Sequence, residues 1–123
     1  MLKFDFFFSK EIKSVKFAFL YPYSYEDQRS DILTLKNLYE VNHDQDIFFK
    51  QYELIKSYQQ RVIDMVIISS HEGKDGYENI KYDEHFDLKE KLVKFRNNKP
   101  IIFVSARVHP IETPSSFCMK GII

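Results

Sequence analysis

A histidine and a glutamate three positions apart give this sequence its clearest candidate chemistry. His109 and Glu112 belong to the string HPIE, near the end of the 123 residues. An imidazole nitrogen and a carboxylate are both common zinc ligands, and two intervening residues in a turn let the two side chains point to one side. A catalytic zinc ion usually takes three protein ligands and keeps one position for water. The pair therefore predicts two of the three ligands of such a site.

A structural explanation competes with the zinc site. The His-x-x-Glu spacing arises often by chance, and a glutamate at the start of a helix is stabilised by the positive end of the helix dipole. On spacing alone, an exposed His109 followed by a helix-start Glu112 is the better interpretation. The position of the pair favours a metal site, because α/β folds place their functional sites in the loop between the carboxyl end of a strand and the following helix.

The elements beside the pair follow from the apolar pattern. Ile101–Val108 is a near-continuous apolar run, which is typical of a strand buried on both faces. Thr113 is expected to cap a following helix, with Pro114 at its first helical position. Ser115 and Ser116 would then lie in the first turn of that helix.

Farther upstream, the pattern predicts one helix and a pair of strands. The helix is expected from Tyr25 to Asn42, with Ser24 as its cap. Phe48–Tyr58 and Arg61–Ser70 have the composition of strands, and the short connection between them predicts an antiparallel pair.

The remaining segments complete the predicted organisation. His71–His85 is charged and contains two glycines, so we expect an exposed loop, and Phe86–Asn98 is expected to be a surface helix. Leu2–Phe8 and Ser14–Leu20 are rich in phenylalanine and predict two further strands. Because two strands are too few for a stable domain, residues 1–21 are expected to be the end of a β-rich N-terminal domain, followed by an α/β domain over 22–123.

Composition limits the classes of function. The sequence has 18 Lys and Arg against 18 Asp and Glu, and this balance argues against nucleic acid or an anionic membrane surface as a partner. No apolar run approaches the roughly 20 residues that a membrane span needs. Cys118 is the single cysteine, so no disulfide forms within the chain, which fits a reducing, cytoplasmic compartment.

Other chemistry-bearing residues have ordinary explanations. His71 and Glu72 follow a predicted strand and imitate a site, but they are expected to be a strand end and loop. His43 and His85 lie in polar surroundings that predict exposure to solvent. Cys118 is expected to be a small buried side chain of a helix, because no histidine is patterned with it as the base of a nucleophile.

The residues around the pair carry a family resemblance. The string ARVHPIETPSSFCMKG resembles the zinc-binding segment of the cytosolic carboxypeptidases, a branch of the zinc metallocarboxypeptidases, whose usual form is Arg-Val-His-Pro-Gly-Glu-Thr-Pro-Ser-Ser. The matching positions are Arg107, Val108, His109, Pro110, Glu112, Thr113, Pro114, Ser115 and Ser116. Phe17–Gln28 is similar to the segment with which that family enters its peptidase domain, and Arg61–Ser70 to the strand that follows. The resemblance covers about Lys16 to Ile123.

The resemblance implies a zinc peptidase with a partial metallocarboxypeptidase-like α/β/α sheet. His109 and Glu112 would be two zinc ligands, and the reaction would be metal-assisted hydrolysis with a glutamate as general base and an arginine for the substrate's terminal carboxylate. In the family, the third ligand, the base and most substrate-binding residues come far downstream. The sequence is therefore expected to be an N-terminal part of the catalytic domain, inactive alone and a weak binder of zinc. Ile111 replaces the usual glycine, and a turn that required a positive φ there would put the ligand geometry in doubt.

The family also implies substrates and a compartment. It removes C-terminal or branch glutamates from acidic protein tails such as those of tubulin, so protein deglutamylation in the cytosol or on microtubules is the expected role. The alternative is a non-catalytic fragment, a binding or assembly module in which the His109–Glu112 pair is idle.

Overall fold

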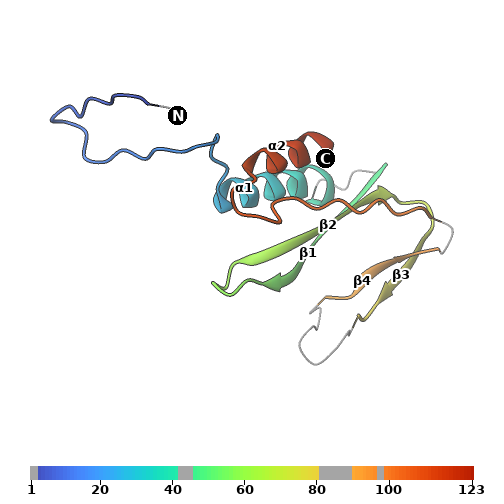
Figure 1. Cartoon of the computed structure of the whole chain (residues 1–123). Helices are drawn as coiled ribbons and strands as arrows, with labels where there is room; N and C mark the ends of the chain where they lie inside the picture. Colours follow the sequence, from blue (N-terminus) through green and yellow to red (C-terminus); the bar gives the residue numbers. More distant parts are fainter. Residues whose placement is uncertain (1–2, 42–45, 81–89, 97–98) are drawn as a thin grey trace. The chain divides into compact units, whose positions relative to one another are not determined.

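The computed structural model describes residues 3–41, 46–80, 90–96 and 99–123. They form two compact units, one of Met1–Tyr23 with Ala106–Ile123 and the other of Ser24–Ser105 (Figure 1). Helices and strands both occur, and the strands in the described part of the chain pair antiparallel as β1–β2 and β3–β4. The predicted α/β class is confirmed.

The larger unit begins with helix α1, Tyr25–Leu35, which continues as a π-helical segment over Lys36–Val41. The predicted cap is present as a reciprocal capping box. The Ser24 hydroxyl accepts from the Asp27 amide at 3.1 Å, and the Asp27 carboxylate accepts from the Ser24 amide at 2.8 Å. The helix prediction is confirmed as far as Val41, and Asn42 lies outside the described residues.

Strands β1, Ile47–Lys56, and β2, Val62–Ser70, form the predicted antiparallel pair. Ile47 lies opposite Ser70 at one end of the ladder, and Lys56 lies opposite Val62 at the other. The connecting turn places Gln60 at a φ of 61°, in the left-handed region.

A second strand pair replaces two predicted elements. Strand β3, Lys74–Glu78, lies where a loop was expected over His71–His85, and strand β4, Leu92–Phe95, lies where a helix was expected over Phe86–Asn98. Both predictions were wrong over these residues. The spacing of Leu92 and Phe95 suits a helix, but Val93 between them is buried, as a strand residue facing the core. Residues 81–89 and 97–98 lie outside the described part.

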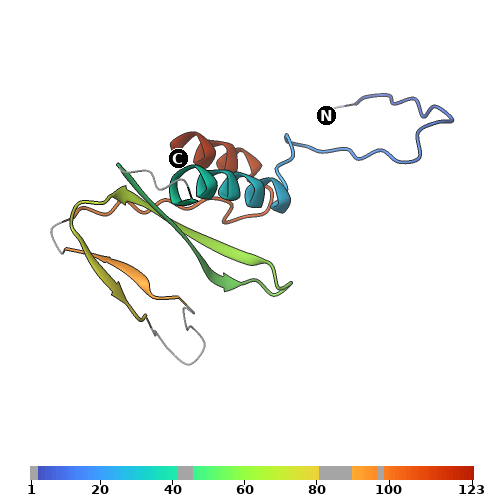
Figure 2. The same cartoon turned by 180° about the vertical axis from the view of Figure 1, so that it is seen from behind.

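Strand β1 is covered on both of its faces (Figures 1 and 2). On one face, the Phe48 ring meets the Phe95 ring of β4 at 5.7 Å, and the Tyr52 hydroxyl accepts the amide N–H of Val93 at 3.0 Å. On the other face, the Phe49 ring stacks on Tyr39 of the π-helical segment at 6.2 Å. The buried apolar core consists of Ile32, Phe48, Phe49, Tyr52 and Val93.

A buried carboxylate fastens α1 to this sheet. The Asp64 side chain on β2 is 1% exposed, and its Oδ1 accepts from Arg29 Nη1 of α1 at 2.5 Å and from Gln51 Nε2 of β1 at 2.6 Å. The Tyr25 hydroxyl of α1 also accepts the Val62 amide, at 3.1 Å. Both hydrogen bonds join α1 to β2, and Gln51 of β1 shares the carboxylate that Arg29 contacts.

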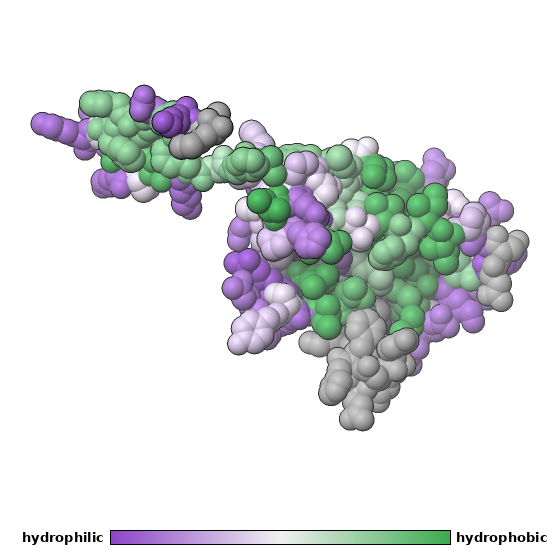
Figure 3. Space-filling view, in the orientation of Figure 1, coloured by the Kyte–Doolittle hydropathy of each residue, from purple (hydrophilic) through white to green (hydrophobic). Residues whose placement is uncertain are grey.

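The smaller unit contains helix α2, Thr113–Ile122, and an N-terminal segment without strands. The strands predicted over Leu2–Phe8 and Ser14–Leu20 are wrong for the described residues 3–8 and 14–20. Aromatic rings do meet across the segment, Phe4 with Phe17 at 5.1 Å and Phe6 with Phe17 at 5.4 Å. No ladder of backbone hydrogen bonds accompanies these contacts in the described segment, and its side chains form an exposed apolar surface (Figure 3).

The buried strand expected over Ile101–Val108 is also absent. Ile101, Ile102 and Phe103 are 91%, 89% and 86% exposed, and the segment is extended without belonging to a sheet. The prediction was wrong because a strand needs a neighbour to pair its backbone groups, and none of the described residues pairs with this run. Neither described α-helix is long and apolar enough to cross a membrane.

Candidate metal-binding turn

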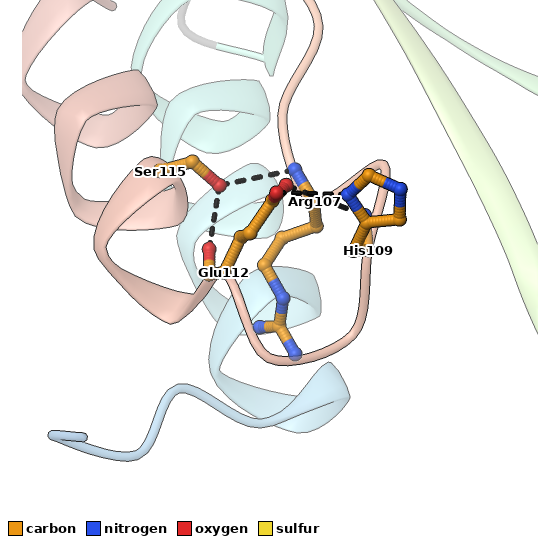
Figure 4. Close-up of polar contacts among 4 residues, drawn as sticks. All are labelled: Arg107, His109, Glu112 and Ser115. Atoms are coloured by element: carbon orange, nitrogen blue, oxygen red, sulfur yellow. Dashed lines mark hydrogen bonds and ion pairs between the residues drawn. The ribbon is translucent and has the colours of Figure 1, made fainter. Parts of the chain in front are cut away.

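The two predicted ligands lie side by side in the turn that precedes α2 (Figure 4). The turn is closed by the Glu112 amide, which donates to the His109 carbonyl at 3.1 Å. His109 Nδ1 lies 2.8 Å from Glu112 Oε1, and the other carboxylate oxygen accepts the His109 amide at 3.3 Å. The HPIE turn thus brings an imidazole nitrogen and a carboxylate together on one side of the chain.

Glu112 occupies the N-cap position of α2 but does not cap it. Its side chain makes no hydrogen bond to the first amides of the helix and is directed at His109 instead. Thr113, which was expected to be the cap, is the first residue of the helix, and Pro114, which was expected at the first helical position, is the second. Both predictions were off by one residue.

Both side chains of the pair are open to solvent. His109 is 70% exposed and Glu112 is 46% exposed, so an ion has access to both without a rearrangement of the core. A nitrogen donor and an oxygen donor at one exposed point are chemically suited to a zinc ion. The chemistry of this donor set therefore fits the implied metal, as two ligands of a larger set.

Ile111 fits its position without strain. Apart from glycines, the described residues with a positive φ are Gln60 and Arg107, both at 61°. Ile111 is therefore outside the left-handed region, and its side chain lies exposed on the turn. The replacement of glycine by isoleucine does not disturb this turn, and the unusual backbone conformation belongs to Arg107.

Arg107 contacts the turn at Pro110 and is linked to it a second time through Ser115. Its guanidinium donates from Nη2 to the Pro110 carbonyl at 2.7 Å and from Nη1 to the Tyr23 carbonyl at 2.9 Å. Its amide donates to the Ser115 hydroxyl at 3.1 Å, and that hydroxyl donates to the Glu112 carbonyl at 2.6 Å (Figure 4). Sequence reasoning noted Arg107 as a matching position and assigned it no role, since a lone arginine before the pair forms no pattern.

Aromatic side chains complete the packing of this unit. The Phe117 ring of α2 meets the Tyr21 ring at 5.7 Å and the Tyr23 ring at 5.1 Å, both edge to face. The segment that precedes α1 is thus packed against the helix that follows the HPIE turn.

The other candidates remain apart from any site. His71 is exposed, and its ring meets the edge of Phe48 at 5.7 Å, which fits the expected structural role. Cys118 is exposed, so its expected burial was wrong, because it lies on the solvent side of α2. His43 and His85 lie outside the described residues. Within the part of the chain that is described, no group of three or more His, Cys, Asp or Glu side chains is placed to hold a metal ion.

Comparison with known proteins gives a consistent set of relatives. The chain is 35% identical over 126 aligned positions to cytosolic carboxypeptidase 6 of Mus musculus, with all of this chain and 18% of that protein covered. It is 34% identical over 107 positions to cytosolic carboxypeptidase 1 of Gallus gallus, with 87% of this chain and 7% of that protein covered. Cytosolic carboxypeptidase-like protein 5 of Homo sapiens is 32% identical over 114 positions, with 87% of this chain and 13% of that protein covered.

The chain thus spans about a fifth or less of the length of these relatives. No family model matches the chain. No solved structure matches it either.

Proposed function

By sequence this chain belongs to the family of the cytosolic carboxypeptidases, and on that premise we propose that it carries two zinc ligands of a metallocarboxypeptidase, His109 and Glu112. One observation supports the proposal most. The Glu112 carboxylate stands at the start of a helix, where the helix amides offer it partners, yet it lies 2.8 Å from the His109 ring. Two donors of the right chemical kind are therefore already together.

In the proposed site, His109 and Glu112 hold the metal, and the turn fixes their spacing. Zinc bound there would supply a Lewis acid for the hydrolysis of a peptide bond. The hydrogen bond from the His109 amide to Glu112 keeps the carboxylate on the histidine side of the turn before any ion arrives. A third ligand is not beside the pair among the described residues, so we expect this chain alone to bind zinc weakly and to lack peptidase activity.

The proposed substrates are acidic protein C-terminal tails, and the proposed reaction is the removal of C-terminal or branch glutamates, as in tubulin deglutamylation. The curated relatives are named cytosolic carboxypeptidases, which supports a hydrolase that acts at the C-terminal end of a chain in the cytosol. The glutamate preference and the association with microtubules rest on the resemblance of the ARVHPIETPSS segment to that family.

Zinc titration of the 123-residue chain tests the metal site. The ring signals of the histidines are followed by nuclear magnetic resonance as zinc is added, and calorimetry gives the affinity. We expect a weak, saturable shift of the His109 ring that is lost in both His109→Ala and Glu112→Ala. His71→Ala is the matched control and should leave the titration unchanged, because His71 packs on Phe48.

The alternative is that the pair is idle and the chain is a binding or assembly module. The absence of a three-residue metal cluster among the described residues favours this candidate. A titration in which the His109 ring does not respond to zinc would support it and refute the metal site. Loss of binding in His71→Ala would instead reveal a third ligand within this chain.

A further inference from the structure

We propose that Arg107 is a positioning residue for the metal-binding turn, and that it acts by tying the turn to the Tyr21–Tyr23 segment. The inference rests on the proposed function, because it concerns the same two ligands. It starts from an unusual conformation. Arg107 lies in the left-handed region at a φ of 61°, which residues with a Cβ adopt at an energetic cost. The hydrogen bonds that Arg107 makes in this conformation offset that cost.

The guanidinium supplies two of these contacts. One nitrogen reaches the Pro110 carbonyl inside the HPIE turn, and the other reaches the Tyr23 carbonyl, which is 84 positions earlier in the chain. A planar fork with several fixed N–H groups can serve two carbonyls at once, whereas the single ammonium of a lysine is a point charge on a flexible stem. The side chain therefore joins two distant backbone segments.

The backbone of Arg107 supplies the third contact. Its amide donates to the Ser115 hydroxyl, and the same hydroxyl donates to the Glu112 carbonyl at 2.6 Å. Arg107 is thus linked to the middle of the turn through Pro110 and to its last residue through Ser115. Both links restrict the turn between His109 and Glu112, so the relative placement of the two ligands depends on a residue that is not itself a ligand.

The Tyr21–Tyr23 segment, to which Arg107 ties the turn, is itself held in place by packing. Two edge-to-face ring contacts with Phe117 hold it on α2, so the Tyr23 carbonyl is presented to Arg107 from a packed segment. Partners that orient metal ligands typically change metal affinity by about 10- to 100-fold when they are removed. We expect an effect at the lower end of that range, because the pair is exposed.

The experiment compares wild type, Arg107→Lys and Arg107→Gly in the 123-residue chain. Arg107→Gly removes the conformational cost and the guanidinium together, while Arg107→Lys keeps the charge. The matched control is Arg61→Lys, an exposed arginine whose guanidinium lies over the Tyr25 ring. Two quantities are measured: zinc affinity at His109, and, without metal, the exchange rates of the His109 and Glu112 amides, both of which are hydrogen-bonded within the turn.

Both Arg107 variants should bind zinc about tenfold more weakly and should exchange the two turn amides several times faster, with the control within twofold of wild type. Exchange of the amides inside α2 should be unchanged, which shows that the unit that holds the turn is folded. Ser115→Ala keeps the guanidinium and removes the link from the Arg107 amide to the Glu112 carbonyl. It should weaken zinc binding and speed the exchange of the turn amides as well, by a smaller factor. This variant tests the proposal if an Arg107 variant does not fold.

Equal turn exchange and equal zinc affinity in Arg107→Lys and wild type would overturn the positioning role. A wild type without His109-dependent zinc binding would refute the proposed metal site. Faster turn exchange in the Arg107 variants would still establish in that case that Arg107 positions the two side chains.

Discussion

The Glu112 carboxylate lies 2.8 Å from His109 Nδ1 and makes no hydrogen bond to the amides that begin α2. At the other helix the relation is reversed, because the Ser24 hydroxyl and the Asp27 carboxylate are both used in the cap of α1. The two helix starts therefore differ in what their polar side chains do. In α1 they stabilise the helix, and before α2 they form a pair available to a ligand.

This difference predicts unequal effects of substitution on stability. Ser24→Ala should lower the free energy of unfolding by about 1 kcal/mol, because it removes the cap of α1. Glu112→Ala should cost less than about 0.5 kcal/mol, since no cap contact is lost. Urea unfolding followed by circular dichroism measures both. A large loss with Glu112→Ala would mean that the carboxylate serves the helix after all.

Tyr52 should be important for stability through its hydroxyl alone. Tyr52→Phe keeps the ring but leaves the Val93 amide, which is buried, without its acceptor. An unsatisfied buried donor costs about 1–3 kcal/mol, so we expect a loss of about 2 kcal/mol in urea unfolding. Tyr58→Phe is the control, because Tyr58 is fully exposed, and it should have no measurable effect.

Alkaline pH should destabilise the chain through the same residue. Burial raises the pKa of the Tyr52 hydroxyl, so the folded state keeps this proton at a pH where the unfolded chain has released it. The contribution of this hydroxyl to the free energy of unfolding is fully present below the ordinary tyrosine pKa of about 10. It is lost as the pH rises through the raised pKa of the folded state. Lys50 contributes in the same direction, because its hydrogen bond to Glu40 raises the pKa of the ammonium.

Urea unfolding between about pH 8 and pH 11 measures this loss, and the range brackets the ordinary tyrosine and lysine pKa values. Tyr52→Phe should make the decline in unfolding free energy shallower, with the part due to Lys50 remaining. An identical decline in wild type and Tyr52→Phe would show that Tyr52 is not responsible.

The buried Asp64 should depend on Arg29. Arg29→Ala leaves a carboxylate that is 1% exposed with Gln51 as its remaining side-chain partner among the described residues. Removal of one partner of a fully buried pair costs about 3–5 kcal/mol, and we expect about 2 kcal/mol here because Arg29 is 37% exposed.

Lys94→Ala is the comparison for Arg29→Ala. It breaks a surface pair with Glu78 at 3.9 Å and should cost less than about 0.5 kcal/mol. Similar losses for the two variants in urea unfolding would contradict a special role for Asp64.

The exposed run near Ile101 should promote self-association. Phe103 is 86% exposed beside two exposed isoleucines, and an unpaired extended apolar segment is a template for contacts between chains. Phe103→Lys should raise the concentration at which the chain stays monomeric in analytical ultracentrifugation. Phe7→Lys changes an exposed phenylalanine of the N-terminal segment instead. It separates the effect of the run near Ile101 on self-association from the effect of exposed apolar side chains in general.

The parts of the fold that were predicted correctly are those whose causes are local. Ser24 and Asp27 are three positions apart, and β1 and β2 are joined by a short turn, so both signals are contained in a few residues. Strand β4 was missed because its assignment depends on Val93 meeting Tyr52, 41 positions earlier. The helical spacing of Leu92 and Phe95 can be read from the sequence, whereas the distant acceptor, the Tyr52 hydroxyl, cannot.

The same distinction holds for the candidate site. His109 and Glu112 were proposed weakly from their chemistry and spacing and more specifically from the resemblance of the residues around them, and the structure brings the two side chains together. The metal role itself stays a prediction. Arg107 was not given a role because its partner, the Tyr23 carbonyl, is remote in sequence and because main-chain acceptors leave no trace in residue type.

The coverage of β1 on both faces has a consequence for its pairing with β2. Because neighbouring side chains of a strand point to opposite faces, a slip by one residue would turn Phe48 and Tyr52 toward the π-helical segment and would turn Phe49 and Gln51 toward β4. Val93 would lose its acceptor and Asp64 would lose Gln51 in the same step. A strand exposed on one face has only one set of contacts to forbid such a slip. Here two independent sets select one alignment of the hairpin.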